Sequence, residues 1–140
     1  MCPYDAKDAR GLLKSAIRND NPVVFLENEM MYGDSFELTE EEMGMDYLIE
    51  IGKGKVERPG KDVTIVAFAK MVKFSLMAAA ELEKNGISCE VINLRSIRPL
   101  DREIIVNSVK KTGRIVTVEE GWAQCGVGAE IAALIMECKF

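Results

Sequence analysis

The 140-residue chain contains no histidine. Histidine is the side chain that most often acts as a general base, so serine–histidine and cysteine–histidine catalysis within this chain are excluded. The chain has four cysteines without a CxxC pair: Cys2, Cys89, Cys125 and Cys138. Because a zinc site would require these scattered thiols to converge, we interpret them as reduced thiols. Cys89 in a strand and Cys138 in a terminal helix are expected to behave as small hydrophobic side chains.

Signals of membrane, nucleic-acid-binding and secreted proteins are also missing. No apolar run approaches the roughly 20 residues that a helix needs to span a bilayer. The 18 basic and 23 acidic residues give a formal net charge of −5 without a long basic cluster, so the electrostatic pattern of a nucleic-acid binder is missing. The N-terminal residues carry neither a secretory hydrophobic region nor the arginine-rich pattern of a transit peptide. With hydrophobic residues at 48%, the chain can bury the core of one domain, or of one domain and part of another.

The stretch from Asp62 to Leu94 predicts a strand, a helix and a second strand. Val63 to Phe68 is a short apolar run rich in β-branched residues, typical of a strand covered on both faces. A stripe at helical spacing follows, and its members are Met71, Val72, Phe74, Leu76, Ala78, Ala79 and Leu82. Asn85-Gly86 ends this helix, because glycine readily adopts the left-handed backbone found after a helix. Cys89 to Leu94 is a second apolar strand, so the sequence predicts a βαβ unit with a right-handed crossover.

Before this unit we expect a helix, a strand and a polar loop. Asp5 to Asp20 has an apolar face and acidic residues at its start, a pattern that favours a helix. Val23 to Glu27 has the apolar composition of a buried strand, and a polar loop follows from Glu29 to Asp46. Tyr47 to Glu57 alternates weakly and predicts a short strand. Because the composition changes between about Ile49 and Asp62, we place a domain boundary there.

After the βαβ unit, the sequence predicts one more helix, a strand and a last helix. Asp101 is a natural N-cap for a helix running to Lys111, and Arg98 is expected to pair with it. The strand spans Ile115 to Glu119, and the last helix runs from about Ala129 to Cys138. These elements together predict an α/β fold with a mainly parallel sheet flanked by helices.

Three features near the last strand are candidates for ligand or partner contacts. Gly126-Val127-Gly128 opens a helix after a strand, where a phosphate could bind, but it lacks the third glycine of a dinucleotide fingerprint and the lysine of a Walker loop. We favour a structural loop that brings the helix close to the sheet, and a small nucleotide-binding protein is the alternative. Glu119 and Glu120 end a strand, where open α/β sheets place ligands, so an acid–base pair is weighed against solvated or interfacial carboxylates. Trp122 is interpreted either as a lid over the core or as an interface anchor.

Several segments also carry a family resemblance: residues 11–18, 21–29, 90–101, 116–122 and 126–131. They resemble the beta subunit of the pyruvate dehydrogenase component, in order and nearly without gaps, over essentially all 140 residues. The resemblance implies that residues 1–48 form the tail of a thiamine-enzyme pyrimidine-binding domain. It also implies that residues 49–140 form a transketolase C-terminal-type domain, truncated at its C-terminal end.

The resemblance implies a reaction and its partners as well. In the family, two alpha and two beta chains use thiamine diphosphate and magnesium to decarboxylate pyruvate, and they transfer the acetyl group to lipoyl groups toward acetyl-CoA. We therefore expect an alpha subunit and a second beta subunit as partners in the mitochondrial matrix, and neither nucleic acid nor a membrane. Docking on the acetyltransferase core is doubtful, because the family's docking C-terminus lies beyond Phe140.

The chain departs from the family pattern at several points. Ala123 stands where the family usually has proline, and Ala69 where it often has serine. The family's activating glutamate and active-site histidine lie upstream of Met1. No catalytic or cofactor-binding residue is therefore assigned, and this chain alone is expected not to decarboxylate pyruvate. The alternative is a non-catalytic interaction or scaffold module derived from that subunit.

The family also has a structural potassium site, supplied largely by backbone carbonyls near a helix end. The matching positions in this chain are Ala16, Ile17, Asn19 and Asn21. An oxygen cage is chemically reasonable there, because the last carbonyls of a helix lack helical partners. The family often has aspartate at position 19, so we expect weaker binding here. A plain helix C-terminus without an ion is the alternative.

Overall fold

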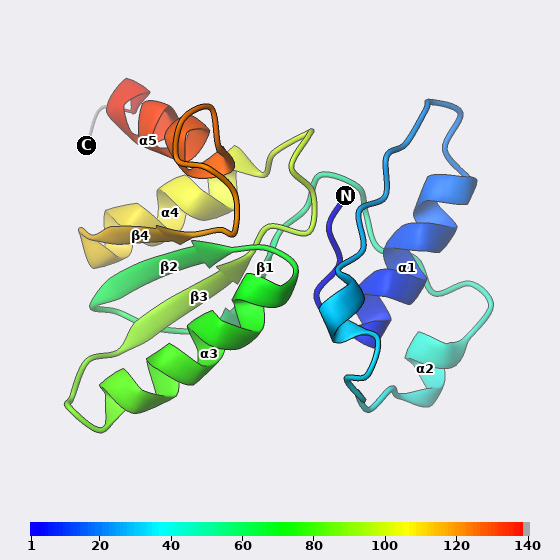
Figure 1. Cartoon of the computed structure of the whole chain (residues 1–140), viewed down its shortest axis with the longest axis horizontal. Coiled ribbons are helices and arrows are strands. Elements are labelled where there is room, and N and C mark those ends of the chain that lie inside the picture. Colours follow the sequence, from blue (N-terminus) through cyan, green and yellow to red (C-terminus); the bar gives the residue numbers. More distant parts are fainter. Residues whose placement is uncertain (139–140) are drawn as a thin grey trace.

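A four-stranded sheet between two layers of helices forms the larger part of the structure (Figure 1). The computed structural model describes residues 1–138. The strands are β1 (Lys55–Arg58), β2 (Val63–Ala67), β3 (Cys89–Asn93) and β4 (Ile115–Val118), in the spatial order β1-β3-β2-β4. The helices are α1 (Ala6–Ile17), the 3₁₀ turn η1 (Glu29–Met31), α2 (Glu40–Met43), α3 (Lys70–Glu83), α4 (Arg102–Thr112) and α5 (Val127–Glu137). Among the described residues, no helix combines the length and the hydropathy of a membrane span.

The predicted α/β fold with a mainly parallel sheet is confirmed. Strand β2 runs parallel to β3, with Val63 opposite Cys89, and parallel to β4 on its other side. Strand β1 joins β3 in the antiparallel direction, with a register shift between Val56 and Arg58. Because α3 connects the parallel strands β2 and β3, the predicted βαβ unit is present.

Side chains along β2 alternate between two helical layers. Ile65 packs on the α3 side, in a cluster with Ala79, Cys89 and Val91. Val66 packs on the side of α4 and α5, in a cluster with Ile92, Leu94, Ile105, Val109, Ile131 and Leu134. Figure 1 shows α3 on one side of the sheet and α4 with α5 on the other. Both faces are covered, which explains why β2 and β3 are apolar runs rather than alternating strands.

Only part of the predicted apolar stripe of α3 is buried. Its buried side chains are Val72, Ser75 and Ala79. Phe74 is 49% exposed, and together with Ala78 it lines an apolar groove beside Val116 and Val118 of β4. The contacts of α3 are mainly with β2 and β3, and the side chains on its β4 side border this groove instead of being covered. Val72 and Ala79 of the predicted stripe are therefore buried as expected, whereas Phe74 and Ala78 lie outside the core, so the stripe was placed too wide on this side.

The strand predicted at Val23 to Glu27 is not formed. Val24 is 70% and Leu26 is 56% exposed. This extended segment exchanges two backbone hydrogen bonds with Met1: the Met1 amino group donates to the Val24 carbonyl at 2.6 Å, and the Leu26 N–H donates to the Met1 carbonyl at 2.8 Å. A strand needs a neighbour along its length, and contact with one residue does not make a ladder.

Helix α4 begins as predicted. The Asp101 carboxylate accepts the N–H of Ile104 at 3.3 Å, and it also accepts the N–H of Gly54 at 3.0 Å. Gly113 ends the helix with a left-handed φ of 68°. The predicted pair of Arg98 with Asp101 is wrong, because Arg98 is exposed and forms no ion pair within residues 1–138 while Asp101 serves backbone donors.

Other element boundaries also differ from those predicted. Helix α1 ends at Ile17, and β1 begins only at Lys55. The polar loop contains the one-turn helix α2, whose Thr39 and Glu42 form a reciprocal capping box. Cys138 directly follows α5 instead of lying within it, whereas Cys89 is in a strand as predicted.

The N-terminal part has a small core of its own. Met1, Leu12 and Ile49 form its buried centre. A Cβ at Gly11 would lie only 2.6 Å from a side-chain carbon of Ile49, so glycine permits this close approach. Figure 1 shows α1 and α2 together, beside the sheet and its helices. A domain boundary after residue 48 stays a prediction.

Candidate functional site

The loop before α5 offers its free N–H groups to a carboxylate of this chain. Glu119 directly follows β4, and it accepts the N–H of Val127 at 3.1 Å and the N–H of Gly128 at 2.8 Å. A Cβ at Gly128 would lie 2.8 Å from this carboxylate and 2.8 Å from the Thr117 hydroxyl oxygen, so only glycine permits the approach. Glu119 therefore fills the phosphate cradle considered for Gly126-Val127-Gly128, and its charge complements the positive end of the helix dipole.

Glu120 has different partners. Its carboxylate lies 2.5 Å from the ammonium of Lys70 and accepts a hydrogen bond from the Asn28 amide at 2.9 Å. These contacts join the end of β4 to the start of α3 and to the loop that precedes η1. Because Glu119 and Glu120 serve separate structural contacts, they do not form the acid–base pair considered from the sequence.

Trp122 lies on the surface of the loop that follows β4. Its side chain is 91% exposed, so it does not cover the core and the lid interpretation is wrong. An interface anchor remains a prediction, since tryptophan is enriched at the centres of protein interfaces.

A buried polar junction joins α1 to the end of β3. Asp8, in the first turn of α1, is fully buried. The Arg95 guanidinium contacts one Asp8 oxygen through two nitrogens, each at 2.7 Å, and the Asn93 amide donates to the other Asp8 oxygen at 2.7 Å. Asn93 also accepts the N–H of Arg95 at 3.1 Å, beside the left-handed turn in which Arg95 has φ 58°. No local sequence pattern predicted this junction, because its members lie about 85 residues apart.

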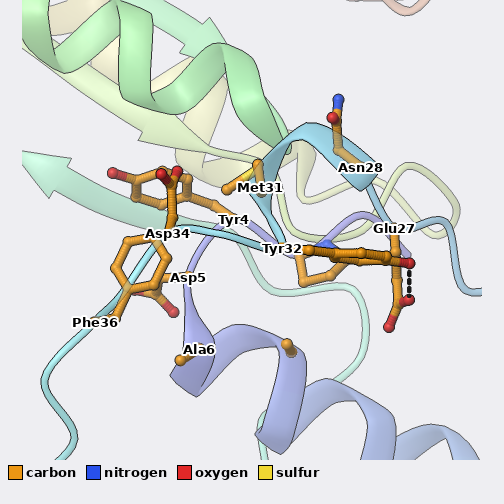
Figure 2. A pocket seen from close by; sticks show the side chains of 11 residues that line it. Tyr4, Asp5, Ala6, Glu27, Asn28, Met31, Tyr32, Asp34 and Phe36 are labelled. Carbon is orange, nitrogen blue, oxygen red and sulfur yellow. Dashed lines mark hydrogen bonds between the residues drawn. The ribbon is translucent and has the colours of Figure 1, made fainter.

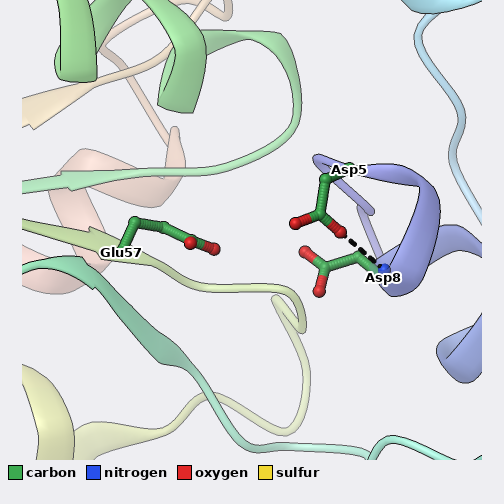
Figure 3. A group of neighbouring side chains, drawn as sticks. All are labelled: Asp5, Asp8 and Glu57. Carbon is green, nitrogen blue, oxygen red and sulfur yellow. Dashed lines mark hydrogen bonds between the residues drawn. The ribbon is translucent and has the colours of Figure 1, made fainter. Parts of the chain in front are cut away.

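Three carboxylates converge at the same junction (Figure 3): Asp5, Asp8 and Glu57 have oxygens within 4.8 Å of one another. Such oxygens could ligate a hard cation, but the chain supplies counter-charges itself. Besides Arg95 at Asp8, Lys55 lies 2.5 Å from Glu57 and Lys7 lies 3.8 Å from Asp5.

Burial raises the pKa of Asp5, and the neighbouring charge of Asp8 raises it further. Each of the three carboxylates has a basic partner in the chain, so the cluster stabilises the contact between the N-terminal part and the sheet.

The positions proposed for potassium lie at the exposed end of α1. The Ala16 carbonyl already accepts the N–H groups of Arg18 and Asn19, and the Asn19 side-chain oxygen accepts the N–H of Asn21 at 2.9 Å and its amide at 3.0 Å. Ile17 is 76% exposed. The four positions are thus close in the chain, but two of their oxygens have protein donors. The potassium assignment stays a prediction.

Comparison with known proteins now places the chain in a family. Residues 52–140 match the transketolase C-terminal domain family. The chain belongs to this family. The match covers the sheet, α3, α4 and α5, and thus the elements that hold Glu119 and Trp122.

Relatives of high identity extend the match to the N-terminal part. The chain is 61% identical over 140 residues to a mitochondrial pyruvate dehydrogenase E1 component subunit beta of Dictyostelium discoideum, covering 100% of this chain and 39% of the relative. It is 64% identical over 137 residues to the protein of the same name from Drosophila melanogaster, covering 98% of this chain and 38% of the relative. The resemblance stated from the sequence is confirmed. The chain spans less than two fifths of the length of these relatives.

A solved structure has the same fold. A chain named "Split gene transketolase, inactive beta4 tetramer" superposes with a TM-score of 0.78 at 35% identity. The superposition covers 96% of this chain and 43% of that one. It therefore extends beyond the family match into the segment that carries α1 and the Asp8 junction.

The sequence suggested a phosphate site at Gly126-Val127-Gly128, but the residues there do not fit the diphosphate group of thiamine diphosphate. At the N-terminus of α5, the N–H groups of Val127 and Gly128 already bind Glu119. A phosphate would bring its negative charge next to that carboxylate. No step of a thiamine-dependent reaction is assigned to this loop.

Proposed function

We propose that this chain serves as part of a pyruvate dehydrogenase beta subunit in the mitochondrial matrix. The observation that supports this is the identity of 61–64% over nearly the whole chain to proteins named mitochondrial pyruvate dehydrogenase E1 component subunit beta. In this proposal residues 1–48 belong to a pyrimidine-binding domain and residues 49–140 to a transketolase C-terminal-type domain. The substrate of the whole enzyme is pyruvate, and its acetyl product passes to lipoyl groups.

The contribution of these 140 residues is structural. Glu119 holds the N-terminus of α5, Glu120 binds Lys70, and Asp8 binds Arg95, so the acids at the sheet end and at the junction are engaged within the chain. The family supplies its activating carboxylate, and thiamine diphosphate with magnesium, from other parts of the enzyme. The chain alone is therefore proposed to be inactive toward pyruvate.

The proposed partners are an alpha subunit and a second beta subunit. Two exposed features support a role in contacts: Trp122 on its loop, and the apolar groove beside Val116. Aromatic side chains are enriched in interface cores, so Trp122 is a candidate anchor for either subunit.

Pyruvate turnover tests this proposal. Dye reduction is measured with thiamine diphosphate, magnesium and pyruvate, first with this chain alone and then with a cognate alpha chain. We expect no turnover above the buffer blank in either mixture. A chimera that restores the relatives' remaining sequence around these 140 residues is expected to be active with the alpha chain. An inactive chimera would contradict the subunit proposal, and activity of the chain alone would contradict its structural role.

A non-catalytic scaffold module is the second candidate. The similar solved structure is named an inactive beta4 tetramer, so a chain of this fold assembles there without activity. Sedimentation of this chain alone and with the alpha chain separates the two candidates. A homo-oligomer that does not bind the alpha chain would favour the scaffold proposal, whereas a complex of both chains would favour the subunit proposal.

A further inference from the structure

A small cavity lies between the N-terminal segment, the first turns of α1 and the loop that contains η1 (Figure 2). Its volume is 180 Å³, which compares with the engineered cavity of about 150 Å³ that holds a benzene molecule. Neither the family resemblance nor the proposed function assigns a ligand to this cavity.

Aromatic rings stand on two sides of the cavity. Tyr4 and Phe36 contact each other edge to face, with ring centroids 5.6 Å apart and an interplanar angle of 78°. Figure 2 shows this pair on one side and the Tyr32 ring on the other, with Ala6 of α1 below. Aromatic faces carry negative charge density, so rings placed around a small space favour a cation over an anion or a neutral group.

Carboxylates add to this preference, and no basic side chain from residues 1–138 lines the cavity. Asp34 is paired with Lys73 at 2.8 Å, and buried Asp5 accepts the N–H of Asp8 at 2.7 Å. Glu27 differs, because no lysine or arginine within the described residues forms an ion pair with it, and its hydrogen-bond partner is the Tyr32 hydroxyl at 2.8 Å. Glu27 therefore offers a carboxylate that a bound cation can neutralise.

The pKa of the Tyr4 hydroxyl reflects the burial and the negative charges around this cavity. Burial raises the pKa of Tyr4, and the charges of Glu57, Asp5, Asp34 and Asp8 raise it further. This direction agrees with a cavity that disfavours additional negative charge.

We propose that this cavity binds a small organic cation, with its alkylammonium group between the aromatic rings and beside Glu27. The rings contribute cation–π attraction, and Glu27 contributes charge at the rim. The expected ligand is a primary or quaternary ammonium compound no larger than choline. Anions of similar size are repelled by the charge of Glu27, which is unpaired among residues 1–138.

The experiment compares choline with its neutral isostere 3,3-dimethylbutan-1-ol, titrated into the 140-residue chain at constant ionic strength. The two probes have nearly the same shape and apolar surface, so their difference isolates the charge. Proton NMR follows the ring signals of Tyr4, Tyr32 and Phe36 and the N-methyl signal of choline, which ring currents shift upfield. A cation–π contribution of about 0.5–2 kcal/mol corresponds to binding of choline about 2–30-fold tighter than the alcohol.

Variants locate the binding to the cavity. Tyr32→Leu and Glu27→Gln are each expected to weaken choline binding severalfold. Tyr32→Phe keeps the ring and releases Glu27 from its hydrogen bond, so it is expected to retain binding. Glu29→Gln is the matched control, because Glu29 is an exposed acid in η1 that does not line the cavity.

Equal affinity for choline and the alcohol would overturn the proposal, as would a choline dissociation constant weaker than about 100 mM. If Glu29→Gln weakened choline binding as much as Glu27→Gln did, this would also overturn the proposal, because the net charge of the chain and not the cavity would then explain the effect. Circular dichroism shows whether a variant is folded. The comparison of the two probes on the unsubstituted chain decides the outcome even if a variant fails to fold.

Discussion

Replacing Arg95 with leucine tests whether the buried junction holds the N-terminal part to the sheet. Asp8 is fully buried, and the Arg95 side chain is only 12% exposed. Leucine keeps a Cβ and an apolar stem in the left-handed turn, so the backbone strain at φ 58° is nearly unchanged. The substitution chiefly removes the charge and two contacts of 2.7 Å to Asp8. The Asp8 carboxylate keeps the Asn93 amide as its strongest donor.

Removing one partner of a buried ion pair costs about 3–5 kcal/mol, because the other charge is left without compensation. A whole domain is stable by only about 5–15 kcal/mol, so we expect a large fall in the urea midpoint of Arg95→Leu. The double variant Asp8→Asn with Arg95→Leu removes the stranded charge. It is expected to recover at least about 1 kcal/mol of the loss, within the usual range of coupling between contacting residues.

Arg102→Leu is the matched control. The Arg102–Glu137 pair has the same separation of 2.7 Å, but its side chains are 55% and 65% exposed. Such a surface pair contributes about 0–1 kcal/mol, because water screens both charges. If Arg95→Leu lowers the free energy of unfolding no more than Arg102→Leu, the junction is not a buried tie and the reasoning from burial fails.

Four further predictions concern the core compared with the helix cap, the dependence of stability on pH, potassium binding and surface contacts. Ile92→Ala is expected to lower the free energy of unfolding by about 2–5 kcal/mol through a cavity in the core, and Asp101→Ala by about 0.5–2 kcal/mol through the lost cap. If Asp101→Ala is the more damaging in urea melts, the assignment of core and cap is wrong. Burial raises the pKa of Glu90, but hydrogen bonds led by that from Lys111 outweigh this and lower it. Because the folded-state pKa is lowered, this stabilisation is present above the unfolded pKa of about 4.3 and is lost as the pH falls through the folded pKa. In urea melts at a series of pH values, Glu90→Gln is therefore expected to reduce the fall in the free energy of unfolding at acid pH. The potassium assignment predicts a higher Tm in KCl than in NaCl at equal ionic strength, and equal Tm values would remove it. Strand β4 is an edge with Val116 50% exposed beside an apolar groove, so we expect self-association that Val116→Lys reduces. A stable monomer of the unsubstituted chain in sedimentation at micromolar concentration would contradict this last prediction.

Local signals in the sequence were sufficient for much of the sheet and α4. The β-branched run at β2 and the cap at Asp101 depend on the residues themselves and their immediate neighbours, and both were predicted in place. The strand predicted at Val23 to Glu27 failed for a different reason. Its apolar residues fit a strand, but strand formation requires a neighbouring strand, which no local pattern reports.

The other features that the sequence did not predict depend on contacts between residues that are far apart in the chain. The stripe on α3 was predicted at the correct spacing, but the face that is buried depends on where β4 lies relative to the helix, so Phe74 was placed in the core wrongly. The contact of Asp8 with Arg95 spans 87 residues, and the placement of Glu119 on α5 requires the loop after β4 to fold back. Helical or strand periodicity contains no information about such contacts.

The position of Glu119 has a consequence for competition at the N-terminus of α5. A free anion must displace a carboxylate that is tethered to the same chain, and a short tether gives an effective concentration on the order of millimolar or more. Glu119 thus acts as an internal competitor for its own helix. A dissolved anion that binds the N–H groups of Val127 and Gly128 no more tightly than a carboxylate leaves them with Glu119 when its concentration is well below that value.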